Sequence, residues 1–422
     1  MRILWFTNTP SLATEHLTGK VGVGGGWIES LELKLQEHGQ IELAIAFPWK
    51  GEKVSTYEIG KGVYYGIPTY SPSKYKRWMD RLNAAIDDPA IVNYYLEIIE
   101  SFKPDVIHIF GSERSYGLLT EHVDIPTFLW IQGNLTVYSM KWYSDITLSE
   151  VKGLTTFKDR IKGDSWIHRF NKFNKEAKRE QKIFSLCKNF TGRTNWDRRL
   201  AMTMSDGANY FHVDEVMRPH FYGPEWSHHG KREKLQLFTT IRGNIYKGLN
   251  SIFHTARVLS KKNIPFEWRL AGIAPNNELV RMVEKKLNTS HKQLSIVPMG
   301  NKTPDELVSE LLFADVFVHP SHIDNSPNSV CEAMLLGVPV VSTNCGGIPD
   351  LLVNEQEGLL VQAGDPYAMA GAILDVHNNP EFAKRISSAA RSRGLKRNDP
   401  DKITKDLLNA YQRVLEGNLT VA

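Results

Sequence analysis

Short apolar runs alternate with segments of helical hydrophobic spacing along the second half of this chain. The runs lie at residues 235–241, 266–273, 294–298, 314–318, 338–342 and 358–361. Runs of this length bounded by turn residues are typical of buried strands, and the segments between them have the apolar spacing of amphipathic helices. Strand and helix repeated in this order predict a parallel, doubly wound α/β sheet of the Rossmann-like kind.

The first half of the chain has the same character with less regular spacing. We predict strands at 2–9, 41–47, 62–70 and 105–111, a strand with its exit loop at 127–134, and a helix at 90–102 that ends before Pro104. With 422 residues the chain is long enough for two domains with separate cores. The expected division is a first Rossmann-like domain at 1–218, a second at 219–398, and a terminal amphipathic helix within 399–422.

Composition narrows the class of protein. Hydrophobic residues make up 41% of the chain and charged residues 23%, which are ordinary values for a soluble globular protein. No apolar run has the length that spans a bilayer, and Met1 leads into a strand without a cleavable signal. The three cysteines show neither a metal-ligand nor a disulfide spacing. We expect a cytoplasmic protein, and a net charge of +4 is too small to argue for a nucleic-acid partner.

Two carboxylates flank the start of the helix that follows the run at 314–318. Asp324 lies in the loop and Glu332 in the first turns of the helix. The N-terminus of a helix can bind an anion through its free N–H groups and its positive dipole end. Glu332 can accept hydrogen bonds from two neighbouring hydroxyls. A nucleotide sugar presents both phosphate and a vicinal diol. The candidate donor-binding residues are therefore Glu332 and the loop residues Ser326, Pro327, Asn328 and Ser329. Either acid alone would be better interpreted as a surface Glu or a capping Asp.

The longer pattern around these acids resembles a known enzyme family. Asp324 and Glu332 are followed by Ala333-Met334-x-x-Gly337-x-Pro339-Val340-Val341 and by Gly346-Gly347-x-Pro349. This pattern resembles the retaining glycosyltransferases of family 4, in the glycosyl transferases group 1, although the usual first Glu is Asp324 here. The resemblance covers most of the second half of the chain. It implies the GT-B fold, in which two Rossmann-like domains face each other across a cleft and the C-terminal helix crosses back to the first domain.

Two cations follow the first strand of the second half. Arg242 and Lys247, with Gly248 directly after, resemble the Arg-x4-Lys-Gly pair with which the family grips the donor diphosphate. Cations beside a flexible glycine turn and a helix start can neutralise charge that develops on a leaving phosphate. A basic surface turn is the plainer interpretation, but the spacing together with Glu332 favours the functional one. We expect Arg242, Lys247 and Asp324 to be catalytic.

Two sites in the first half are weaker candidates. Gly24, Gly25 and Gly26 lie in a glycine loop that suits a donor-binding turn, as in the family, or a simple strand–helix turn. The segment does not match the dinucleotide-binding fingerprint G-x-G-x-x-G, because Trp27 occupies the position of the third glycine. This mismatch argues against a nicotinamide enzyme. Gln132 occupies a position where many relatives have a His facing the donor sugar. Gln can bond a sugar hydroxyl but cannot take a proton. We nevertheless count Gln132 among the expected catalytic residues, as the family position implies.

Residues 152–182 contain ten cations and four acids, with Trp166, Phe170 and Phe173 at helical spacing. Such a segment is typical of an element that lies on an anionic membrane surface, or of a solvated helix face whose aromatic residues pack inward. The family resemblance favours the membrane, because many relatives act on lipid-linked acceptors.

The resemblance implies an enzyme that transfers a sugar, with retention, from a UDP- or GDP-sugar to a hydroxyl of a glycan or lipid-linked acceptor in bacterial surface polysaccharide synthesis. It implies no cofactor beyond this substrate. No metal site is expected, since Asp399 and Asp401 suit a helix N-cap and His228 and His229 lack further ligands. A nucleotide-sugar 2-epimerase and a non-catalytic nucleotide-sugar-binding partner are the alternatives. The expected location is the cytoplasm or the inner face of the cell membrane.

Overall fold

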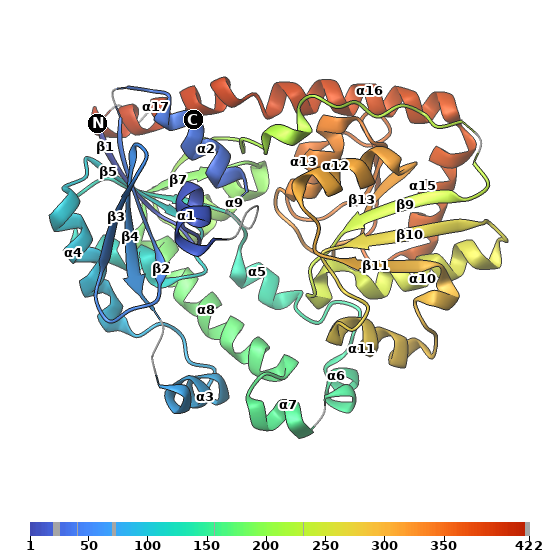
Figure 1. The fold of residues 1–422 in the computed structure, drawn as a ribbon, viewed down its shortest axis with the longest axis horizontal. Coiled ribbons are helices and arrows are strands. Elements are labelled where there is room, and N and C mark those ends of the chain that lie inside the picture. The colour runs from blue at the N-terminus through green and yellow to red at the C-terminus, as the bar shows by residue number, and fades with distance from the viewer. Residues whose placement is uncertain (20–25, 40, 70–72, 156, 231, 418–422) are drawn as a thin grey trace. The chain divides into compact units, whose positions relative to one another are not determined.

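The computed structural model describes residues 1–19, 26–39, 41–69, 73–155, 157–230 and 232–417. The chain divides into two compact units, and each contains one sheet (Figure 1). The first unit comprises Met1–Ser139, Thr155–Val216 and Asp399–Ala422, and the second comprises Met140–Leu154 and Met217–Asn398.

The sheet of the first unit has eight strands in the order β3-β4-β2-β1-β5-β6-β7-β8. Every neighbouring pair is parallel except β3 and β4, which form an antiparallel hairpin at one edge. The strands are β1 (Arg2–Phe6), β2 (Glu42–Trp49), β3 (Ser55–Ile59), β4 (Gly62–Pro68), β5 (Val106–Phe110), β6 (Thr127–Trp130), β7 (Asn189–Gly192) and β8 (Asn209–His212).

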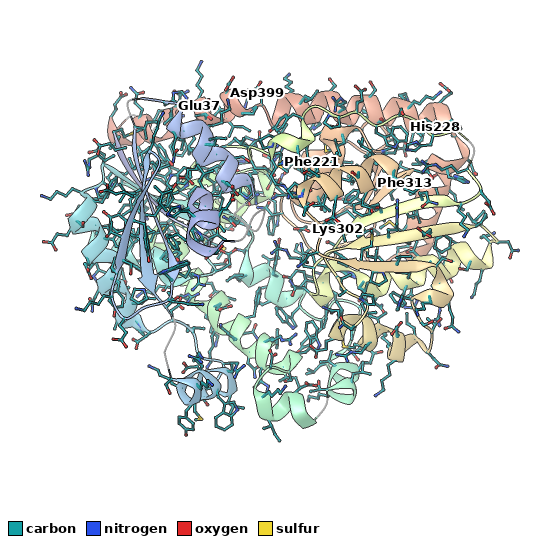
Figure 2. All side chains as sticks on the ribbon, in the orientation of Figure 1. Glu37, Phe221, His228, Lys302, Phe313 and Asp399 are labelled. Carbon is teal, nitrogen blue, oxygen red and sulfur yellow. The ribbon has the colours of Figure 1, made fainter. Side chains whose placement is uncertain are left out.

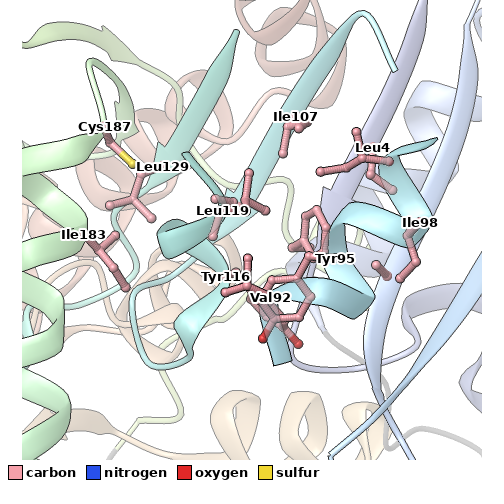
Figure 3. Close-up of a cluster of buried hydrophobic side chains, with 14 of the residues drawn as sticks. Leu4, Val92, Tyr95, Ile98, Ile107, Tyr116, Leu119, Leu129, Ile183 and Cys187 are labelled. Carbon is pink, nitrogen blue, oxygen red and sulfur yellow. The ribbon is translucent and has the colours of Figure 1, made fainter. Parts of the chain in front are cut away.

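Both faces of this sheet carry a hydrophobic core. Leu4 and Phe6 of β1 belong to one cluster, which Figure 3 shows, whereas Ile3 and Trp5 belong to another. Successive side chains of a strand point to opposite faces, so the sheet is covered on both sides. The helices of this unit are α1 (Thr14–Thr18), α2 (Trp27–Gln36), α3 (Lys74–Leu82), α4 (Val92–Phe102), α5 (Leu135–Met140), α7 (Phe157–Lys162), α8 (Trp166–Leu186), α9 (Asn195–Met204) and α17 (Pro400–Leu415).

The C-terminal helix α17 packs on the first unit, as the family resemblance implies. Asp399, labelled in Figure 2, caps it by accepting a hydrogen bond from the Lys402 amide at 2.8 Å. Tyr411 is fully buried, and its hydroxyl lies 2.5 Å from Nδ1 of His108 in β5. Burial lowers the pKa of His108 to about 3, so this histidine is a neutral core residue.

The sheet of the second unit is entirely parallel, with six strands in the order β11-β10-β9-β12-β13-β14. They are β9 (Leu235–Thr240), β10 (Phe266–Ala271), β11 (Ile296–Gly300), β12 (Val316–His319), β13 (Val340–Thr343) and β14 (Leu359–Val361). The helices are α6 (Leu148–Leu154), α10 (Leu249–Lys261), α11 (Glu278–Leu287), α12 (Pro304–Phe313), α13 (Asn328–Leu336), α14 (Ile348–Leu351), α15 (Pro366–Asn378) and α16 (Pro380–Arg397). Two Rossmann-like sheets confirm the predicted fold class.

Residues 140–154 differ from the predicted division, because they pack with the second unit although the sequence assigns them to the first domain. The Trp142 ring lies 6.0 Å from that of Tyr246. Asp145 accepts a hydrogen bond from Asn250 Nδ2 at 2.8 Å, and its carbonyl accepts one from Lys286 Nζ at 2.7 Å. Aromatic packing and these polar contacts attach the segment to the second sheet's helices.

No helix in the described ranges is long and apolar enough to cross a bilayer.

Candidate functional site

Three loops of the second unit meet at the carboxyl edge of its sheet. They follow β9, β12 and β13, which are neighbours at the centre of the sheet. Between β9 and β12 the strand order reverses, and a crevice at such a switch point is where doubly wound sheets bind ligands. The loops after β9 and β12, together with the helix α13 that follows the second of them, carry most of the site residues that the sequence indicates.

Lys247 and Asp324 form an ion pair between the first two of these loops. The Lys247 Nζ lies 2.6 Å from Asp324 Oδ2. Gly248 holds the two loops close, since a Cβ at this position would lie 2.1 Å from the carbonyl oxygen of Pro320, and its φ of +84° favours glycine. The His322 amide also donates to the carbonyl of Tyr246 at 2.8 Å. The pair is therefore positioned by main-chain contacts.

Asp324 is buried among groups that favour its charged form. Its Oδ2 lies 3.1 Å from Nε2 of His319 and accepts a hydrogen bond from the Ser321 hydroxyl at 3.3 Å. Gly346 of the third loop packs against it so closely that a Cβ there would lie 1.8 Å from the Asp324 carbonyl oxygen. Burial by itself raises the pKa of Asp324, but the Lys247 charge and His319 outweigh it and hold the pKa below its ordinary value. Asp324 is thus a carboxylate at neutral pH.

Glu332 is buried in α13 and pairs with Arg218, which lies 114 positions earlier in the chain. The Arg218 guanidinium also lies over the ring of Phe221, 4.9 Å from its centroid. Burial raises the pKa of Glu332, and the nearby Arg218 charge opposes this effect. The two carboxylates of the predicted pattern consequently have different environments, because Lys247 is paired with one and Arg218 with the other.

The start of α13 has no side-chain cap. Pro327 occupies the N-cap position, and its carbonyl accepts from Val330 and Cys331. Within the described ranges, no hydrogen bond is made by the amides of Asn328 and Ser329. These half-buried residues open the helix, so its positive end and two free N–H groups are available to an anion.

Arg242 extends from the loop after β9 and is exposed. Its side chain has no hydrogen bond or ion pair with any residue that the structure describes. A free guanidinium, the Lys247 ammonium and an uncapped helix start at one sheet edge form an arrangement that suits a diphosphate.

Comparison with known proteins agrees with this geometry. Residues 226–393 match the family model described as "Glycosyl transferases group 1". This stretch is a group 1 glycosyltransferase domain. It contains the Lys247–Asp324 pair and the whole of α13.

Two curated relatives illustrate the likeness. The chain is 33% identical over 146 residues to the putative colanic acid biosynthesis glycosyltransferase WcaL of Escherichia coli, covering 32% of this chain and 34% of that protein. It is 26% identical over 167 residues to the amylovoran biosynthesis glycosyltransferase AmsK of Erwinia amylovora, covering 38% of this chain and 40% of the other. The matched stretch is therefore less than half of either relative.

Solved structures resemble the entire fold. The sucrose-phosphate synthase of Thermosynechococcus elongatus aligns with a TM-score of 0.72 at 13% identity, covering 99% of this chain and all of the other. The Anabaena protein HepE in complex with UDP-glucose aligns with a TM-score of 0.62 at 12% identity, covering 98% and 99%. At these identities the likeness establishes the GT-B fold.

The candidates in the first half of the chain lie in the first unit, outside the group 1 domain. Gly24 and Gly25 fall outside the described residues. Gly26 is the N-cap of α2 with φ +59°, a conformation that favours glycine. Gln132 follows β6 and is half-buried, and its carbonyl accepts a hydrogen bond from Arg193 at 2.8 Å.

Sequence reasoning missed three residues of the candidate site in the second unit. Arg218 pairs with Glu332, His319 contacts Asp324, and Arg397 donates to the Ser326 hydroxyl at 3.3 Å. His319 directly precedes the loop of Asp324 and could have been proposed from strand alternation. Arg218 and Arg397 lie outside any motif, so no sequence signal pointed to them.

The basic segment 152–182 combines exposed cations with inward-packed aromatic residues. Trp166 is 3% exposed, and Phe170 and Phe173 are half-buried. Trp166 is therefore not available for insertion into a membrane in this structure. Four lysines of α8 are exposed: Lys172, Lys175, Lys178 and Lys182. The described residues contain no group of three or more His, Cys, Asp or Glu side chains placed to hold a metal ion.

Proposed function

We propose that this protein is a retaining glycosyltransferase of family 4. It transfers a sugar from a UDP- or GDP-sugar to a hydroxyl of a glycan or lipid-linked acceptor, in bacterial surface polysaccharide synthesis. One observation carries the proposal: Lys247, Arg242 and the uncapped start of α13 lie around the switch point of the second sheet. The names of the curated relatives, which refer to colanic acid and amylovoran biosynthesis, support the same class of product.

In the proposed reaction the donor diphosphate binds to the start of α13, beside Ser326, Pro327, Asn328 and Ser329. Lys247 and Arg242 neutralise the charge that grows on the diphosphate as the glycosidic bond breaks. Lys247 already has a carboxylate partner, Asp324, at 2.6 Å. When the phosphate binds, the ammonium either leaves Asp324 for the phosphate or contacts both. Its position is thereby fixed before the donor arrives, which reduces reorganisation during the reaction.

Glu332 binds the ribose hydroxyls of the donor, with Arg218 fixing the carboxylate behind them. Gln132 and the glycine loop that includes Gly24, Gly25 and Gly26 are proposed to contact the donor sugar. Gln132 cannot take a proton, so the acceptor proton passes to the donor phosphate on the same face of the sugar. The first unit binds the acceptor.

The proposal includes no cofactor and no metal, since the nucleotide sugar is the substrate and the protein's own cations bind its phosphates. The exposed cations of 152–182 are proposed to hold the protein on an anionic membrane surface. Because Trp166 is buried, this contact is electrostatic and needs no insertion.

The experiment measures nucleotide release with a panel of UDP- and GDP-sugars, with a glycan acceptor present, at saturating donor. Lys247→Ala and Arg242→Ala should each lower turnover by about 10²–10³-fold, as expected when a preorganised partner of developing charge is removed. Lys285→Ala, in the last turn of α11, is the matched control and should leave turnover unchanged. Near-normal turnover in both site variants, at an unchanged melting temperature, would refute the phosphate role.

A nucleotide-sugar 2-epimerase on the same fold is the alternative. It would use the same donor residues but would need no acceptor. NMR of the reaction mixture distinguishes the two, because an epimerase inverts the sugar's C2 configuration and forms no glycosylated acceptor.

A further inference from the structure

A cavity that is open to solvent lies in the first unit, and no residue discussed for the donor lines it. Its volume is about 310 Å³, and it is lined by Leu82, Asn83, Ala84, Asn171, Asn174, Lys175 and Lys178. This volume is at the lower end of small-molecule sites, which span roughly 300–1,000 Å³. No residue of the lining is acidic.

One wall of the cavity is a single face of α8. Asn171, Asn174, Lys175 and Lys178 are spaced three, four and seven residues apart, which places them on the same side of a helix. The other wall is the turn that ends α3, where Asn83 is the C-cap and Ala84 adopts φ +48°. Lys175 joins the walls, since its Nζ donates to the Asn83 carbonyl at 2.7 Å.

Lys175 is bound to the Asn83 carbonyl, but the other polar side chains of the lining have no protein partner among the described residues. Among the described residues, none makes a hydrogen bond to the side-chain amides of Asn83, Asn171 and Asn174 or an ion pair with Lys178. The neighbouring acids have cations of their own: Glu176 lies 3.8 Å from Lys172, and Asp87 lies 3.2 Å from Arg179. Lys178 therefore keeps an uncompensated positive charge at the cavity.

These groups define the chemistry of a ligand. Each amide offers both donors and acceptors, which matches hydroxyls that do both. The ammonium selects a negative charge, and Leu82 and Ala84 offer an apolar surface to a sugar ring. A polyhydroxylated anion fits all three features.

The cavity lies toward the edge of the first sheet at which an acceptor would bind. Arg179, one turn beyond Lys175 on α8, donates to the carbonyl of Glu113 at 2.5 Å. Glu113 follows the carboxyl end of β5 by three residues. Ligands of doubly wound sheets bind outside these strand ends, so the cavity adjoins that region through one turn of helix.

We propose that this cavity binds an acidic residue of the acceptor, a sugar bearing a carboxylate or a phosphate. The inference rests on the proposed function in that it identifies the ligand as acceptor. The binding site itself can be tested without any turnover.

The experiment measures binding by calorimetry to the full-length protein with three probes: a disaccharide containing glucuronic acid, glycerol phosphate, and the neutral disaccharide cellobiose. The acidic probes should bind more tightly than cellobiose. Whichever acidic probe binds better identifies the source of the charge. Lys178→Gln and Asn174→Ala should each weaken that binding by about 10–100-fold, as for the loss of a hydrogen bond to a charged group.

Lys182→Gln is the matched control. It lies one turn further on the same helix, where its Nζ contacts Glu121 at 2.8 Å, and binding should not change. Equal binding of cellobiose and the acidic probes, or equal binding by Lys178→Gln and the unmodified protein, would overturn the proposal. If no donor sugar is transferred but acidic probes still bind through Lys178, the site stands while the proposed function fails. If transfer occurs and Lys178→Gln leaves the acceptor KM unchanged, the proposed function stands and this acceptor site is wrong.

Discussion

Replacing Asp324 with Asn should destabilise the second unit. The substitution keeps the shape of the side chain but removes the negative charge 2.6 Å from the Lys247 ammonium. Removing one partner of a buried ion pair costs about 3–5 kcal/mol. The Asp324 side chain is 9% exposed but that of Lys247 is 20% exposed, so water hydrates the ammonium in part. We therefore expect a loss of about 2–3 kcal/mol, which lowers the Tm of a domain of this size by about 4–12 °C.

The assay is scanning calorimetry without nucleotide, repeated over a pH series. Because the folded-state pKa of Asp324 lies below its ordinary value, the pair stabilises the fold above the unfolded pKa of about 4. This stabilisation is lost as the pH falls through the folded-state pKa. The difference between the unmodified protein and Asp324→Asn should consequently be full at pH 7 and disappear in acid.

A double-mutant cycle with Lys247→Met isolates the pair itself. The coupling free energy should be about 1.5 kcal/mol or more, the lower end of the range for close charge pairs. Asp406→Asn breaks the exposed pair with Lys402, whose 2.7 Å separation is close to that of Lys247 and Asp324, and should change stability by less than about 0.5 kcal/mol. A coupling below about 0.5 kcal/mol for Lys247 and Asp324 would show that burial does not strengthen their interaction, and the reasoning would fail.

Four further results are expected. Glu332→Gln should weaken UDP binding in calorimetry by about 10–100-fold, because it removes charge-assisted hydrogen bonds to the ribose; unchanged affinity contradicts this role. Turnover should persist in excess EDTA, and loss of activity that Mg²⁺ or Mn²⁺ restores would contradict the metal-free proposal. Co-sedimentation with vesicles should increase with anionic lipid and decrease with salt, since each cation near such a surface contributes about 1 kcal/mol; equal binding to neutral vesicles would exclude the electrostatic contact. Burial raises the pKa of Glu113 to about 7, so the stability it adds is full below pH 4.5 and is lost by about pH 7. Glu113→Gln should remove this part of the pH dependence of the unfolding free energy in denaturant titrations. If the unfolding free energy of the variant falls as much between pH 4.5 and pH 7 as that of the unmodified protein, the assignment is contradicted.

Apolar periodicity predicted the second unit better than the first. Its strands are buried on both faces and read as continuous apolar runs, so each run at 235–318 corresponds to a strand of the sheet. The edge strand β3 was missed because its residues alternate between half-buried and exposed, which leaves no apolar run.

Side-chain pairing was harder to predict than position. The spacing around Gly248 indicated that Lys247 would lie at a ligand site, but it did not indicate that Asp324 would be its partner. That contact depends on how closely two loops approach, through Gly248 and the Pro320 carbonyl. Arg218 reaches Glu332 across 114 positions, a separation at which local pattern carries no information.

The amphipathic reading of 152–182 was incomplete for a similar reason. Spacing places Trp166 with Phe170 and Phe173 on a face of α8, but it does not say what that face meets. In the folded unit Trp166 is buried. Burial there depends on tertiary packing, which the segment's own sequence does not specify.

The return of α17 to the first unit affects how the protein folds during synthesis. The core around Ile3 and Trp5 includes Ile403, Leu407 and Tyr411, which the ribosome adds only after Met217–Asn398. At about 5–20 residues per second, that delay is about 10–40 s. Throughout it, this apolar face has the cover of α2 but lacks that of α17, and His108 lacks its tyrosine partner. This chain therefore most needs a chaperone while the first unit waits for α17 to be synthesised. The second unit can complete its own core before translation ends.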